Sequence, residues 1–64
     1  MDYRIMIRRH PGGTPEFTGF VVPYGDAATI FARGFQAGLR ACSKPYQVVV
    51  MNTAGKIYYE CSAQ

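Results

Sequence analysis

The chain has 64 residues, a formal net charge of +3 and a hydrophobic content of 48%. This length allows one small domain, residues 1–64, and excludes a second lobe or a deep catalytic cleft. Two cysteines do not make a disulfide framework, and residues 1–10 lack the layout of a secretory signal. We therefore expect reduced thiols and a cytoplasmic location, in the host cell if a phage encodes the protein.

The N-terminal third of the chain predicts a β-hairpin. Side chains alternate in polarity through residues 3–9, as in a half-buried strand. Residues 10–15 are rich in Gly and Pro and predict a turn, and residues 16–22 predict a second strand that is apolar on both faces. The first strand is expected to present Tyr3, Ile5 and Ile7 on one face and Arg4, Met6 and Arg8 on the other.

Residues 26–42 form the only segment with helical spacing, because apolar or small side chains recur there at every third or fourth position. Asp26 is expected to cap the helix, and Pro45 prevents its continuation. The predicted water-facing side carries Arg33, Gln36 and Arg40, and the predicted buried side carries Ala27, Phe31, Gly34, Phe35, Gly38, Leu39 and Cys42.

Two glycines, Gly34 and Gly38, lie one turn apart on the predicted buried side of this helix. Each weakens a helix interior by about 1 kcal/mol relative to alanine. We expect that a close approach of the helix backbone to a sheet compensates for this cost. A self-association surface is the alternative interpretation.

The C-terminal third predicts a second hairpin. Residues 46–51 are dense in β-branched side chains, residues 52–55 predict a tight turn, and residues 56–61 predict the returning strand. Residues 62–64 are expected to form a frayed tail. The last strand is expected to present Ile57, Tyr59 and Cys61 on one face and Lys56, Tyr58 and Glu60 on the other.

These elements predict a ββαββ chain of the α+β class, with a four-stranded, mainly antiparallel sheet and one helix packed on one face. The order of the strands does not follow from the pattern. Because one helix covers only one face, one of the pairs Phe17/Val21 or Phe20/Val22 must point away from it. The same holds for Val48/Val50 or Val49/Met51. Exposed apolar surface of this kind typically marks a partner site.

The chain lacks a recognisable catalytic or metal constellation. His10 is its only histidine, and the residues needed for a catalytic triad or for zinc spacing do not accompany it. We therefore predict no enzymatic activity, no metal and no cofactor.

The sequence favours a small binding or inhibitor protein that docks on a macromolecule through an open sheet face or edge. In size and layout the chain resembles the small inhibitors that phages and mobile elements encode against host defence, anti-CRISPR proteins among them. We expect a protein partner or a nucleoprotein complex. We expect no membrane, because Arg33 and Arg40 interrupt the helical segment and it is shorter than the ~20 apolar residues of a membrane span. Nucleic-acid binding and homodimerisation are the alternatives. The predicted partner-binding residues are Arg4, Met6, Arg8, Arg9, Lys56 and Tyr58.

Overall fold

The computed structural model describes residues 1–10 and 12–61. Its elements, in chain order, are β1 (Tyr3–Arg8), β2 (Glu16–Val22), α1 (Gly25–Ala41), β3 (Gln47–Asn52) and β4 (Ile57–Glu60). The predicted ββαββ order and α+β class are confirmed. Pro11 of the predicted turn and the predicted tail at residues 62–64 lie outside the described residues.

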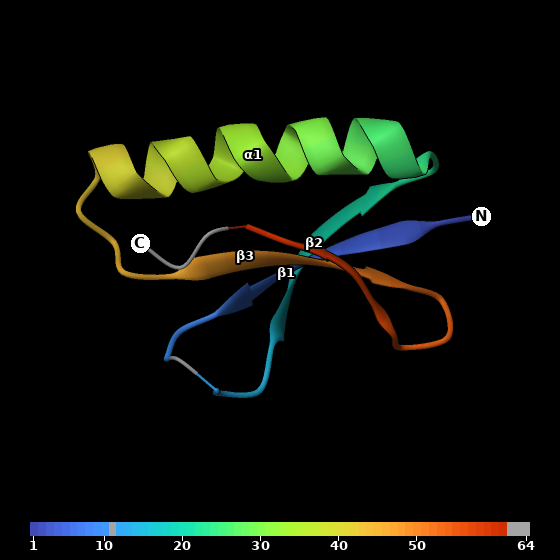
Figure 1. The fold of residues 1–64 in the computed structure, drawn as a ribbon, viewed down its shortest axis with the longest axis horizontal. Coiled ribbons are helices and arrows are strands. Elements are labelled where there is room, and N and C mark those ends of the chain that lie inside the picture. The colour runs from blue at the N-terminus through green and yellow to red at the C-terminus, as the bar shows by residue number, and fades with distance from the viewer. Residues whose placement is uncertain (11, 62–64) are drawn as a thin grey trace.

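The four strands form one antiparallel sheet with the order β2-β1-β3-β4. Each hairpin contributes one inner and one outer strand, and the hairpins meet where β1 pairs with β3, from Tyr3 opposite Asn52 to Arg8 opposite Gln47. The helix lies along one side of this sheet (Figure 1). The inner strands β1 and β3 therefore position the outer strands and the helix.

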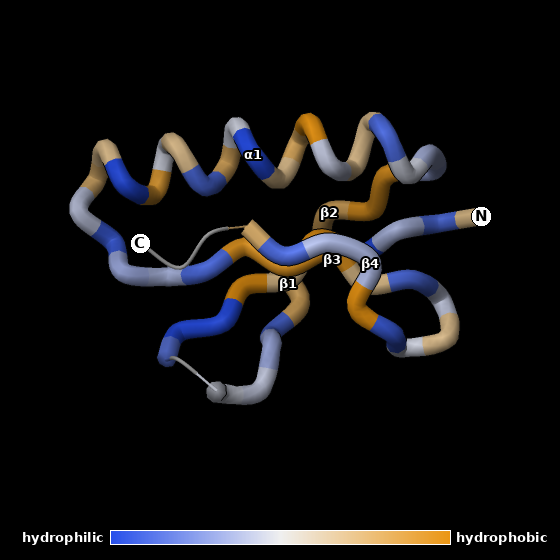
Figure 2. Tube along the Cα trace, viewed as in Figure 1, coloured by the Kyte–Doolittle hydropathy of each residue, from blue (hydrophilic) through white to orange (hydrophobic). Residues whose placement is uncertain are grey.

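The core lies between α1 and the two inner strands. Ile5 of β1 and Val48 and Val50 of β3 are fully buried, and they pack with Ala28 and Ala32 of the helix. Figure 2 shows this apolar stretch of β1 and β3 passing beneath α1. Tyr3 and Ile7 also pack against the core, which confirms the predicted faces of β1.

The buried side of α1 differs from the prediction by about one residue of helical rotation. The buried residues are Ala28, Ala32 and Gln36. Of the positions predicted to be buried, Phe35 and Leu39 pack against the core, whereas the others are exposed, namely Ala27, Phe31, Gly34, Gly38 and Cys42. The small alanine side chains let the helix lie close to the inner strands. The bulky aromatic residues are displaced to one edge of the helix, where three rings pack at centroid distances of 5.3 to 6.3 Å. These rings belong to Phe20, Phe31 and Phe35.

Gln36 was predicted to face water, and that prediction is wrong. Its side-chain amide donates to the carbonyl oxygen of Tyr46 at 2.8 Å, and its side-chain oxygen accepts from the backbone N–H of Val48 at 2.8 Å. Both polar ends are thus satisfied, so burial of this side chain carries no unpaired group. The contact fastens the helix to the start of β3.

The helix begins one residue earlier than predicted, and Asp26 is not its cap. The capping position is Tyr24, which is extended and makes no side-chain capping hydrogen bond. The first helical bond runs from the N–H of Ala28 to the carbonyl oxygen of Tyr24, at 2.9 Å. Asp26 therefore falls within the first turn, where its charge still complements the helix dipole.

The predicted reason for the two mid-helix glycines is also wrong. A Cβ atom added at Gly34 or Gly38 would meet no atom within 4 Å. Neither glycine allows a close approach within this chain, because the sheet lies on the other side of the helix.

Both outer strands depart from regular pairing. Along β2 the register shifts between Arg4 and Met6, Gly19 adopts a φ of 97°, and the hydroxyl of Thr18 donates to the carbonyl oxygen of Ile5 at 2.7 Å. Along β4 the register shifts between Val50 and Met51. Irregularities of this type change which way the following side chains point.

Candidate functional site

The face of the sheet that points away from α1 is the candidate site. Figure 1 shows the helix on one side only, and no helix or strand of residues 1–10 and 12–61 covers the other side. We call this surface the open face. In the cross-strand register it is built from two rows. The first row runs Val21, Arg4, Met51, Ile57, and the second runs Phe17, Met6, Val49, Glu60.

The open face is apolar at both outer strands. Phe17 and Val21 of β2 are 52% and 48% exposed, and Ile57 of β4 is 46% exposed. Met6 and Met51 lie between them, half-buried on the inner strands. The sequence left open which apolar pair of each strand points away from the helix. The pairs on the open face are Phe17/Val21 and Val49/Met51. Apolar side chains here extend from one edge of the sheet to the other.

A positive charge lies within this apolar surface. The guanidinium of Arg4 is 5.9 Å from the centroid of the Phe17 ring, a contact that is favourable because the ring face is electron-rich. Arg4 forms no ion pair with any residue that the structure describes. The charge of Arg4 is thus exposed to solvent at the centre of the first row.

Arg8 of β1 lies across the open face and links β1 to β3, to β4 and to the β1–β2 loop. One terminal nitrogen donates to the side-chain oxygen of Gln47 at 2.8 Å and to a carboxylate oxygen of Glu60 at 3.0 Å, and Nε donates to the carbonyl oxygen of Gly13 at 3.0 Å. The Arg8 side chain is only 14% exposed. Its position is that of a structural clamp that holds β1, β3 and β4 in place.

The other basic residues predicted to bind a partner lie at the margins. Arg9 follows β1, pairs with Glu16 at 2.9 Å and has its guanidinium 5.3 Å from the ring centroid of Tyr46. The hydrogen bond to the Glu16 carboxylate and the charge of that carboxylate raise the pKa of Arg9 above its ordinary value. Lys56 is exposed in the β3–β4 connection, next to Ile57. Of the predicted cations, Arg4 therefore lies within the first row and Lys56 lies next to the Ile57 end of that row.

Tyr58 was predicted on the open face, and the structure corrects this. Its ring packs against the ring of Tyr3 with centroids 4.7 Å apart, and its hydroxyl lies 2.5 Å from where a Cβ would stand on Gly25. The register shift in β4 pairs Ile57 with Met51 and Tyr59 with Val50, so Tyr58 is the extra residue. The bulge turns Tyr58 toward the helix and places Ile57 on the open face.

The prediction of binding residues omitted most of the apolar members of the open face. Phe17, Val21 and Met51 belong to segments that are apolar on both sides, so alternation alone did not distinguish their faces. Ile57 was assigned to the wrong face because a bulge leaves no mark in the polarity pattern. The pairing register is the signal that locates all four.

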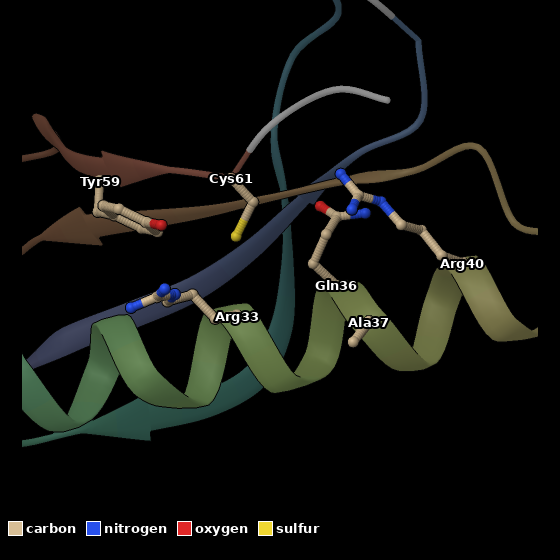
Figure 3. A pocket seen from close by; sticks show the side chains of 6 residues that line it. All are labelled: Arg33, Gln36, Ala37, Arg40, Tyr59 and Cys61. Atoms are coloured by element: carbon tan, nitrogen blue, oxygen red, sulfur yellow. The ribbon is translucent and has the colours of Figure 1, made fainter.

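A second candidate is a shallow pocket of about 240 Å³ between α1 and the end of β4 (Figure 3). The helix contributes Arg33, Gln36, Ala37 and Arg40, and the other wall is formed by Tyr59 and Cys61. This volume is below the roughly 300–1,000 Å³ of typical ligand sites. The Gln36 amide is already bound to the backbone, so the pocket offers fewer groups for a ligand than its lining suggests.

The two cysteines are free and differ in exposure, Cys42 being exposed and Cys61 buried. The thiol of Cys61 donates to the carbonyl oxygen of Ala32 at 3.4 Å. Burial raises the pKa of this thiol, and the charges of Arg40 and Arg33 partly oppose that effect. Cys61 is therefore held as a neutral thiol at neutral pH, which is a packing role and not that of a nucleophile.

Among residues 1–10 and 12–61, no cluster of three or more His, Cys, Asp or Glu side chains has the arrangement of a metal site. The helix of this part of the chain also lacks the length and apolar character to cross a membrane. Comparison with protein-family models, with curated proteins and with solved structures finds no match to this chain. The site must therefore be interpreted from its own geometry.

Proposed function

We propose that the protein is a non-enzymatic binding module that docks its open face on another protein. The observation that carries this proposal is the uncovered first row, in which Val21, Arg4, Met51 and Ile57 cross all four strands. Apolar side chains on a rigid sheet surround a positive charge there. Surfaces of this composition gain free energy by removing apolar area from water, while the charge selects the orientation.

The charges of the open face indicate the chemistry of the partner. Arg8 is engaged by Glu60, so the charges that remain for a partner are those of Arg4 and Lys56. A complementary surface would be apolar at its centre and carry acidic side chains opposite these two cations. Docking of this kind acts by covering the partner's own surface, and it fits the inhibitor role predicted from the sequence.

The test is affinity capture from a host lysate with the tagged protein, followed by mass spectrometry. Wild type is compared with Ile57→Asp, which places an anion in the first row, and with Thr53→Asp, an exposed position in the nearby loop. We expect a protein captured by wild type and by Thr53→Asp and lost with Ile57→Asp. Circular dichroism establishes that each variant is folded. Capture that is equal with all three would contradict docking by the open face.

Nucleic-acid binding is separated from this proposal by its dependence on salt. Phosphate contacts weaken steeply as salt rises, with a slope that tracks the number of phosphates neutralised. We expect no change in the fluorescence anisotropy of labelled random DNA or RNA at low salt. Binding that disappears in an Arg4→Gln, Lys56→Gln double variant would replace the protein partner by a nucleic acid.

A further inference from the structure

The side of α1 that faces solvent has an unusual composition. At 3.6 residues per turn, the residues opposite the buried side occupy about a third of the helix circumference, and none of them is polar. They are all exposed. We call this surface the outer face, and it consists of Ala27, Ile30, Gly34, Ala37, Gly38 and Ala41.

This pattern reverses that of an ordinary surface helix, which places charged residues toward water. Here one of the three buried residues of α1 is the polar Gln36, while Ile30 on the outer face is 69% exposed. The charged residues Asp26, Arg33 and Arg40 gather along one flank. The exposed rings of Phe31 and Phe20 border the other flank and extend the apolar surface.

We propose that the outer face binds the same face of a second copy of this chain, with the two helices antiparallel. The sizes of the side chains support this choice of partner. If a two-fold axis passes near Gly34, then Ile30 of one copy lies opposite Gly38 of the other, and Ala27 lies opposite Ala41. The one large side chain of each outer face, Ile30, thus meets the small Gly38 of the other copy, so the surface is complementary to itself, as a two-fold interface requires.

The charged flank also favours the antiparallel arrangement. A two-fold axis across the helices brings the same flank of both copies together, so Asp26 in the first turn of one helix approaches Arg40 in the last turn of the other. The helix dipoles are then opposed, which is favourable. Two Arg33 side chains meet at the solvent edge, where exposed charges interact weakly. Parallel helices, related by a two-fold axis along their length, would instead bring the charged flank of each copy beside the aromatic flank of the other.

The area of the outer face sets the strength expected of this dimer. A helix of 17 residues is about 25 Å long, and one helix width of that length is less than the roughly 800 Å² per partner of a stable interface. The dimer is therefore weak and depends on concentration. Because α1 and the open face are on opposite sides of the sheet, the dimer presents two open faces that point outward. This bivalence increases the avidity for a partner that has two sites.

The experiment is sedimentation velocity over two decades of concentration, up to the high micromolar range. Two variants are matched in residue type and in change, Ile30→Glu on the outer face and Ile57→Glu on the open face. We expect wild type and Ile57→Glu to dimerise with rising concentration, and Ile30→Glu to remain monomeric. A wild type that is monomeric throughout would overturn the proposal. So would a dimer that Ile57→Glu abolishes and Ile30→Glu retains.

A third variant, Gly34→Ala, distinguishes an effect on dimerisation from an effect on the stability of the monomer. Alanine is the better helix former and has room for its Cβ within the chain, so the monomer should become more stable. The same methyl group keeps two helices apart at the two-fold axis, so dimerisation should weaken by tenfold or more. A Gly34→Ala protein that dimerises as strongly as wild type would exclude helix contact at this position.

Discussion

The side-chain oxygen of Gln36 accepts a hydrogen bond from the backbone N–H of Val48 at 2.8 Å, and this bond joins the centre of the helix to the start of β3. The amide nitrogen of the same side chain donates to the carbonyl oxygen of Tyr46. One glutamine thus completes the pairing of a strand that begins beneath the helix. The helix is fixed over the sheet by polar contacts as well as by packing.

Replacement of Gln36 by leucine should lower the free energy of unfolding by about 2–4 kcal/mol, because the buried N–H of Val48 and the partly buried carbonyl of Tyr46 lose their partner. Urea denaturation followed by circular dichroism measures this loss. Arg33→Leu, an exposed position on the adjacent turn, is the control and should change stability by less than about 0.5 kcal/mol. Equal stability of the two variants would show that the Gln36 contacts contribute nothing.

Tyr58 and Ile57 are 47% and 46% exposed, yet they should respond differently to truncation. Tyr58→Ala removes the ring that packs on Tyr3 and Gly25, and we expect a loss of about 1–2 kcal/mol. Ile57→Ala removes a side chain from the open face and should cost less than about 1 kcal/mol. A larger loss for Ile57→Ala than for Tyr58→Ala would contradict the assignment of Ile57 to the open face.

Arg8 and Arg9 are adjacent arginines whose ion pairs differ in exposure. The Arg8 side chain is 14% exposed, whereas Arg9 and its partner Glu16 are about half exposed, at 49% and 52%. We expect Arg8→Met to lower the free energy of unfolding by about 1–3 kcal/mol, because Gln47, Glu60 and Gly13 lose a shared donor. Arg9→Met should have an effect near zero. Chemical denaturation of both variants in the same buffer makes the comparison, and equal losses would refute the clamp role of Arg8.

Three glycines at the helix give opposite predictions for the change to alanine. At Gly34 and Gly38 the new methyl group meets open space, so each change should stabilise the monomer by up to about 1 kcal/mol. At Gly25 it would displace the hydroxyl end of Tyr58, and the change should be destabilising despite the better helix propensity. Thermal denaturation at low protein concentration tests the signs. A stabilising Gly25→Ala would show that Tyr58 moves away without cost.

The cysteines should differ in reactivity toward a thiol reagent in the native protein. Cys42 is exposed and should react rapidly at neutral pH, whereas Cys61 should react at least tenfold more slowly. A Cys42→Ser variant isolates the second reaction in a chromogenic disulfide assay. Rapid labelling of the folded variant would contradict the buried position of Cys61.

The pH dependence of stability follows from the same thiol. Because burial raises the pKa of Cys61, the folded state favours the protonated form. This contribution is complete below the ordinary thiol pKa of about 8.5 and is lost as pH rises through the raised value in the folded protein. Wild type should therefore lose stability at alkaline pH more steeply than Cys61→Ala.

The local elements could be predicted from the sequence because their signals are local. The helix and strand bounds agree with the structure to within about one residue, and the faces of β1 follow from strict alternation. The strand order could not be predicted, since either strand of each hairpin could have been the inner one. The open face was predicted as a surface, but its apolar members on the outer strands required the pairing register.

Two errors have a common physical origin, which is that polarity does not report size or register. Alanine and phenylalanine count alike in a hydrophobic period, but the fully buried apolar residues of the helix are the small Ala28 and Ala32, whereas Phe35 and Leu39 pack against the core while only partly buried. Gln36 appears polar and was assigned to water, although the first residues of β3 needed a partner for their backbone. Tyr58 shows the second error, because one extra residue in β4 reversed its direction.

The irregular pairing of β2 and β4 has a consequence for the behaviour of the protein in a crowded cell. Both outer strands carry a bulge, and β4 has only four residues, so neither border offers a long, straight template to an incoming strand. Amyloid-like stacking, which requires such templates, is thereby disfavoured even though the chain exposes apolar side chains. The proposed docking surfaces can thus stay exposed while the edges of the sheet resist strand-to-strand polymerisation.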